Sequence, residues 1–190
     1  DVSLWRGTLG FTADYYYSKT TDMLFDVPVS SVSGLTSSNV NIGSMQNRGI
    51  ELALTSRRSF GDFSYAFAAN WSLNRNKVLS LGDENADIIK ESSYAGGYYL
   101  TRVGQPVGCY YLLVQDGIFH NQEELDSYPH FDTTTVGDFR FVDANGNGIL
   151  EKDADRVIVG NYMPDFYYGF SVNLSWKGFD LAANFQGVYG

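Results

Sequence analysis

Apolar and polar residues alternate with a period of two in several stretches of this chain. In the clearest one, residues 63–74, every second residue is aromatic or aliphatic and those between are Ser, Ala and Asn. Residues 166–176 repeat the pattern, with bulky apolar residues at the even positions. Successive side chains of a strand point to opposite faces, so each stretch predicts a strand with one apolar and one polar face.

The polar face of these strands distinguishes a membrane sheet from a soluble one. A soluble sheet usually presents Lys, Glu and Thr to water, whereas here the polar positions carry Ser, Asn, Ala and Gly. Strands of about ten residues that are apolar outward and polar inward are typical of transmembrane β-barrels. We therefore predict an all-β fold, a segment of an antiparallel transmembrane β-barrel. Its lumen face would include Ser64, Asn70, Ser171, Asn173, Asn184 and Gln186.

The same pattern predicts the order of elements along the chain. Strands are expected at 7–18, 40–55, 63–74, 166–176 and 179–188, with a bulge or a bend at Gly49, a loop at 30–39 and short turns at 57–62 and 177–178. Residues 81–161 lack long alternation; there we expect a strand over 107–119 that turns at Asp116-Gly117, and a helix over 121–126 capped by Asn121. Short turns on one side and one long connection on the other predict that 81–161 is an extracellular loop region.

Composition narrows the classes of function. The 190 residues contain no apolar run of the roughly 18 that a spanning helix needs. The net charge of −9 argues against a nucleic-acid partner. The sequence has no nucleophile elbow, phosphate-binding loop or metalloprotease motif, so we do not expect an enzyme. The alternation continues to the end of the chain, from which we expect a segment of a larger protein.

One stretch resembles a calcium-binding loop. Oxygen-bearing side chains stand at its positions 1, 3 and 5 and a glycine at position 6, as in the first half of an EF-hand loop. The candidate ligands are Asp143, Asn145, Asn147, the Ile149 carbonyl, and Asp153 or Asp155 as the closing carboxylate. Position 12 holds Ala154, and two of the three side-chain ligands are neutral, so weak affinity is expected. The alternative is a metal-free loop of Asx turns.

The order of several short motifs resembles the SusC/RagA-type TonB-dependent outer-membrane transporters of Bacteroidetes. The matching stretches run in the same order over nearly the whole chain: Thr21–Pro28, Asn41–Glu51, Asn74–Val78, Gly104–Gly108, Asp116–Phe119, Gly137–Asp143, Ile158–Asn161, Tyr168–Phe170 and Lys177–Leu181. The chain departs from the family pattern by one extra residue before the closing acid of the loop, and by Cys109 at a position that is usually small.

The resemblance implies that residues 1–190 are the C-terminal part of a 22-stranded barrel in the bacterial outer membrane. It implies import of glycans or other oligomeric nutrients, oligosaccharide or peptide, energised by TonB. A SusD-like surface lipoprotein and membrane lipid would be its partners.

Tyrosines gather in the 81–161 region, and these could stack on sugar rings: Tyr94, Tyr98, Tyr99, Tyr110 and Tyr111. Packing within the loop is the alternative role for each of them. A soluble secreted β-sandwich with a calcium-stabilised loop that binds glycans is the rival interpretation of the chain. It also explains the aromatic residues and the acidic loop. It does not explain strands with an apolar face on one side and an uncharged polar face on the other.

Overall fold

The computed structural model describes residues 1–28, 37–82, 85–92 and 97–190. The elements, in chain order, are β1 (Val2–Leu4), β2 (Leu9–Pro28), β3 (Ser37–Phe60), β4 (Phe63–Leu81), β5 (Ile88–Glu91), β6 (Tyr98–Thr101), β7 (Cys109–Leu112), β8 (Gln115–Ile118), α1 (Gln122–Ser127), β9 (Phe139–Phe141), β10 (Val157–Gly160), β11 (Phe166–Trp176) and β12 (Phe179–Tyr189). The chain divides into two units: residues 1–86, 103–106 and 163–190, and residues 87–102 and 107–162.

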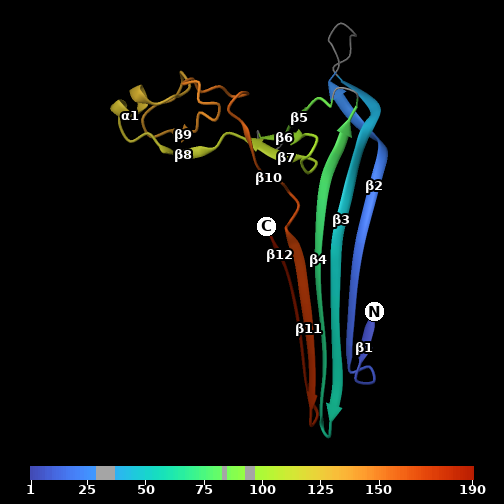
Figure 1. Ribbon diagram of the computed structural model, residues 1–190. Helices are drawn as coiled ribbons and strands as arrows, with labels where there is room; N and C mark the ends of the chain where they lie inside the picture. Colours follow the sequence, from blue (N-terminus) through green and yellow to red (C-terminus); the bar gives the residue numbers. More distant parts are fainter. Residues whose placement is uncertain (29–36, 83–84, 93–96) are drawn as a thin grey trace. The chain divides into compact units, whose positions relative to one another are not determined.

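The first unit is a single antiparallel sheet in the strand order β1-β2-β3-β4-β11-β12 (Figure 1). β11 and β12 occupy the predicted ranges, except that β12 extends to Tyr189. They are joined by Lys177 and Gly178, whose φ angles of +47° and +84° suit the tight hairpin turn whose twist matches that of the strands. The alternation therefore predicts both strands of this hairpin to within one residue.

β2, β3 and β4 are longer than the alternation predicts. The six-residue turn expected at 57–62 is wrong, because Arg57 and Arg58 pair with Ala66 and Tyr65 and only Gly61 and Asp62 form the turn. The prediction of a loop at 30–39 is wrong for residues 37–39, because β3 begins at Ser37. Residues 30–36 lie outside the described residues. Ladder hydrogen bonds join backbones, so a strand can continue where its side chains no longer alternate.

Gly49 is not a bulge. It pairs in regular register with Tyr16 and Asn74, and the register shift of β3 against β4 lies at Ser44–Met45. A Cβ at position 49 would stand 2.3 Å from the Leu73 carbonyl oxygen and 2.5 Å from the Tyr16 ring. Glycine is there because Tyr16 lies across it, with its hydroxyl donating to Asn74 Oδ1 at 3.1 Å.

The second unit contains a four-stranded antiparallel sheet, β10-β7-β6-β5, and the two-stranded pair β8–β9. The predicted helix is confirmed as α1, and the Asn121 side chain accepts from the Glu124 N–H at 2.8 Å. The turn predicted at Asp116-Gly117 is wrong, because both residues lie within β8. The buried apolar side chains of this unit are Ile88, Leu100, Cys109, Phe119, Leu125 and Leu150.

α1 is short, and no helix in the described part of the chain has the length and apolarity needed to cross a membrane.

Candidate functional site

The apolar face of the six-stranded sheet is uncovered. Its large side chains keep substantial exposure, for example 77% for Phe179, 60% for Leu181 and 54% for Phe185. In a soluble sandwich a second sheet would bury this face, and within the described residues nothing does so. The β-sandwich alternative predicts a second layer over this face, and the residues that the structure describes supply none.

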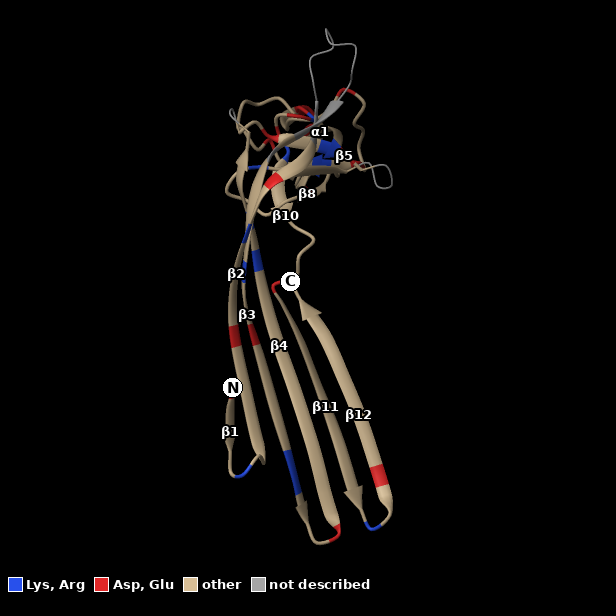
Figure 2. Cartoon of the chain, turned by 90° about the vertical axis from the view of Figure 1, so that its right-hand side faces the viewer, with Lys and Arg blue, Asp and Glu red and all other residues tan. Residues whose placement is uncertain are grey.

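Charged residues bound the apolar face at two levels. On β3 they are Arg48 and Arg58, with Ile50, Leu52 and Leu54 between them. Ten residue steps at about 3.4 Å each, tilted by about 40°, span roughly 26 Å along a membrane normal. An apolar band of about 25 Å is the height found on outer-membrane barrels. Figure 2 shows how few charges the long strands carry between their ends.

The strand register brings the predicted lumen residues onto one face. Asn70 lies opposite Gly169, which lies opposite Gln186, and Ser171 lies opposite Asn184. Ser64 and Asn173 occupy the same face, because directly opposed residues of antiparallel strands project to the same side.

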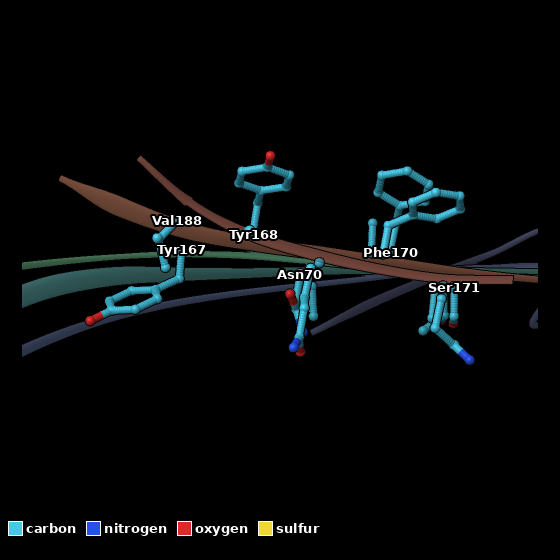
Figure 3. Close-up of a pocket in the computed structure, with 15 residues that line it drawn as sticks. Asn70, Tyr167, Tyr168, Phe170, Ser171 and Val188 are labelled. Carbon is cyan, nitrogen blue, oxygen red and sulfur yellow. The ribbon is translucent and has the colours of Figure 1, made fainter. Parts of the chain in front are cut away.

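A hollow of 840 Å³ over β4, β11 and β12 shows both faces in one view (Figure 3). Tyr168 and Phe170 point to one side of the ribbon, and Asn70, Tyr167 and Ser171 to the other. The hollow is therefore an open depression and not an enclosed cavity. It lies in a sheet that is one layer thick, where residues such as Gly169 have no side chain.

One feature of the polar face could not be found from the sequence. Asp14 and Glu51 lie directly opposite each other on β2 and β3, beside Thr12, Asn70 and Ser72. Like charges directly opposed across a sheet are destabilising, so this pair needs access to water or a cation. The two residues are 37 positions apart, and only the register joins them.

The structure brings four of the five predicted tyrosines together on β6 and β7. Tyr98 pairs with Tyr111 on one face, and Tyr99 with Tyr110 on the other. The rings of Tyr99 and Tyr110 lie 5.8 Å apart, and Tyr99 remains 36% exposed. The fifth, Tyr94, lies outside the described residues.

Arg156 covers one of these tyrosines. Its guanidinium carbon is 3.5 Å from the centroid of the Tyr98 ring, and its side chain is only 10% exposed. Arg156 also pairs with Asp153 at 2.6 Å. Tyr98 is therefore engaged in packing within the unit, whereas the Tyr99–Tyr110 pair retains exposed ring surface.

The acidic loop is built from Asx turns. Asp143 accepts from the Gly146 and Gly148 N–H groups, each at 2.7 Å. Asn145 accepts from the Asn147 N–H at 2.9 Å, and Asn147 from the Ile149 N–H at 2.8 Å. These bonds hold the side-chain oxygens of positions 1, 3 and 5 in one tight loop.

Asp155 closes this loop, and Asp153 does not. Asp155 is fully buried and accepts from the Ala144, Asn145 and Glu151 N–H groups. Asp153 is 92% exposed and faces Arg156. Of the two acids proposed as closing ligand, the structure brings only Asp155 to the loop. In the part of the chain that the structure describes, no three or more His, Cys, Asp and Glu side chains are grouped so that they could hold a metal ion.

Hydrogen bonds from backbone N–H groups, that of Glu151 foremost, lower the pKa of Asp155 below its ordinary value despite burial. A carboxylate whose pKa falls on folding stabilises the fold above its unfolded pKa, and that contribution is lost as pH falls toward the folded pKa. We expect Asp155→Asn to destabilise the loop by about 1–2 kcal/mol at pH 7, because one N–H partner would face an amide NH₂.

Hydrogen exchange checks this expectation. After correction for intrinsic rates, the loop amides should lose protection in Asp155→Asn at pH 7, and in the parent protein below about pH 4. Asp153→Asn is the matched control, since its carboxylate is exposed, and should leave protection unchanged. Equal loss in the two variants would show that Asp155 does not close the loop.

Comparison with known proteins identifies the class. The family model described as "TonB dependent receptor-like, beta-barrel" matches residues 2–189. The chain belongs to this family, whose members are transporters of the Gram-negative outer membrane rather than enzymes. The fold class predicted from the alternation is confirmed.

Two relatives from Formosa agariphila, the TonB-dependent receptors P26 and P3, are 33% and 35% identical over the whole chain, which covers 19% of each. SusC of Bacteroides thetaiotaomicron is 24% identical over 96% of the chain and 18% of its own length. The solved RagAB peptide importer in its closed-closed state matches 98% of the chain and 20% of its own, with a TM-score of 0.71 and 25% identity. The chain thus spans about a fifth of the relatives it matches.

Proposed function

We propose that residues 1–190 form part of the barrel wall of a TonB-energised importer in the bacterial outer membrane. The observation that carries this proposal is the one-layer sheet with an uncovered apolar face and a small, polar opposite face. Lipid would cover the first face and an aqueous lumen the second. Family membership over residues 2–189 supports the same assignment.

The orientation follows from the connections. Gly61-Asp62 and Lys177-Gly178 are two-residue turns at the same end of the sheet, since Phe63 and Phe179 both pair with Trp176. Short turns face the periplasm in outer-membrane barrels, so the 81–161 region would stand on the cell surface. There it could meet cargo and a SusD-like lipoprotein.

The cargo would be an oligosaccharide or another oligomer such as a peptide. The exposed Tyr99 ring, beside the half-buried Tyr110, supports a carbohydrate, because aromatic rings present flat apolar surface to sugar rings. The solved relative RagAB is described as a peptide importer, which keeps peptides among the candidates.

Two measurements test the proposal on the full-length protein. Fractionation should find it in the outer membrane, extracted only by detergent, and in-frame deletion should abolish uptake of one class of labelled oligomer. Tyr99→Ala combined with Tyr110→Ala should reduce uptake of a glycan cargo about tenfold. Tyr162→Ala, another exposed tyrosine of the same unit, is the matched control. A protein recovered in the soluble fraction would refute the barrel assignment.

The calcium site remains a proposal. Asp143, Asn145, Asn147 and the Ile149 carbonyl would supply the oxygens, with Asp155 as a further carboxylate bonded to the loop. Calorimetric titration of the full-length protein with CaCl₂ is expected to give a Kd in the extracellular range of about 10⁻⁴–10⁻³ M. Asp143→Asn should remove the heat, whereas Asp153→Asn should not. If millimolar calcium gave no heat, the calcium site would be refuted, and the alternative of a metal-free loop of Asx turns would stand.

A further inference from the structure

Two arginines line one hollow at the turn end of the sheet. The hollow has a volume of 530 Å³ and is lined by Trp5, Arg6, Thr8 and Arg58. The first three come from the connection between β1 and β2, and Arg58 comes from β3. Figure 2 shows the two basic segments, the β1–β2 turn and the stretch near the lower end of β3.

Within the described residues, no carboxylate lies within 4.0 Å of the guanidinium group of Arg6 or Arg58. Arg58 instead lies over the Phe60 ring, 4.6 Å from its centroid. Two positive charges that share a hollow repel each other, and an anion with several oxygens would relieve this repulsion through paired N–H donors.

The backbone holds the hollow in a defined shape. Trp5 and Arg6 have φ angles of +50° and +58°, in the left-handed region that bulky residues rarely adopt. The Gly7 N–H donates to the Leu4 carbonyl at 3.2 Å and the Thr8 N–H to the Trp5 carbonyl at 3.3 Å, which fixes the turn. Positive φ angles suit a hairpin turn, as at Lys177, so the turn itself fixes where Arg6 lies.

The hollow adjoins the apolar face of the sheet. Arg58 pairs with Tyr65, so its side chain stands on the face of Phe63 and Phe67 rather than on the polar face. Trp5 is 73% exposed, and exposed tryptophans concentrate at the boundary between membrane and water. An anion bound between Arg6 and Arg58 would thus lie at the edge of the hydrocarbon.

We propose that this hollow binds the phosphate of an anionic glycerophospholipid, whose acyl chains lie along the neighbouring apolar face. Arg6 and Arg58 hold the phosphate oxygens, and the Trp5 ring packs at the level of the glycerol. This inference rests on the proposed membrane location and adds a specific lipid site at the periplasmic side. A phosphodiester joined to apolar chains fits both halves of the site, whereas free phosphate would use only the basic half.

The test measures lipid binding to the full-length protein, purified in detergent, by native mass spectrometry. Wild-type protein titrated with phosphatidylglycerol should retain lipid more tightly than with phosphatidylcholine. The double variant Arg6→Gln/Arg58→Gln should weaken phosphatidylglycerol binding about tenfold or more. Lys177→Gln is the matched control: it removes a cation at the same end of the sheet but outside the hollow. Arg6→Lys/Arg58→Lys should lie in between, because lysine keeps the charge without the bidentate fork.

Heat-shifted migration on a gel confirms that each variant is folded, and the single variants carry the same comparison if the double variant fails to fold. Equal binding of the two lipids, or equal loss in the double variant and Lys177→Gln, would overturn the proposal. If inorganic phosphate at micromolar concentration displaced the bound phosphatidylglycerol, the proposal would also be overturned, in favour of a free-anion site. Since binding is measured on purified protein, failure here is distinct from failure of the transport assay.

Discussion

Replacing Val172 with arginine is expected to destabilise the barrel by about 1–3 kcal/mol, because a basic residue on the lipid face costs about 2–4 kcal/mol at the bilayer midplane and less toward the interfaces. Val172 lies near the middle of β11 on the apolar face, between Phe67 and Ala183 of the adjacent strands. Neither neighbour offers a partner for a guanidinium group, so the charge would be desolvated. Urea unfolding of the full-length protein from phospholipid vesicles measures the change.

Asn173→Arg is the matched control for Val172→Arg. It introduces the same side chain one residue along β11, on the opposite face, where Ala66 and Ala182 leave room. A lumen-facing arginine remains hydrated, so we expect a change within about 0.5 kcal/mol. Equal destabilisation by the two variants would mean that both faces, or neither, meet lipid, and the assignment of faces would be wrong.

Gly49→Ala is expected to cost about 3 kcal/mol, at the upper end of the range for overpacking. The new Cβ would lie 2.3 Å from the Leu73 carbonyl oxygen, which is backbone of the neighbouring strand, so relief requires β3 and β4 to separate. The Tyr16 ring, 2.5 Å away, would also be displaced, and its hydrogen bond to Asn74 would be lost. The same urea unfolding assay reports the change.

Gly187→Ala separates backbone collision from side-chain collision. At Gly187 the added Cβ would meet only the outer atoms of the Tyr168 ring, at 2.5 Å, and that ring can rotate away. We expect about 1 kcal/mol or less. If Gly187→Ala were as destabilising as Gly49→Ala, the collision with the Leu73 carbonyl would not be the cause.

Period-two alternation predicted the strands whose two faces meet different surroundings, lipid on one side and water on the other. It placed β11 and β12 within one residue, because a slip in register would expose the wrong face to lipid. It failed beyond the apolar band, where β3 and β4 continue as ladders without a difference between their faces. It also misread Gly49 as a bulge, since a close approach by Tyr16 requires glycine equally well and is visible only in the register.

The candidate sites show the same division. The sequence identified the acidic loop, because its ligand-like residues are consecutive, but not which of two nearby acids closes it; burial selects Asp155. It identified the tyrosines by composition but could not separate Tyr98, covered by Arg156, from Tyr99. The hollow between Arg6 and Arg58 joins residues about fifty positions apart, and no local pattern predicts it.

The connectivity of the sheet bears on the order in which it assembles. β2, β3 and β4 are consecutive strands that pair with their neighbours in sequence, as are β11 and β12. Each group can therefore form its hydrogen bonds progressively from a local turn. β4 and β11 pair across a much longer stretch of chain: Ser72 contacts Tyr167, nearly a hundred residues away. Closing so long a loop carries a larger entropic penalty, although that penalty rises only with the logarithm of length. Prior folding of residues 107–162 would shorten the effective loop, so the region that we propose to meet cargo would also speed the pairing of β4 with β11.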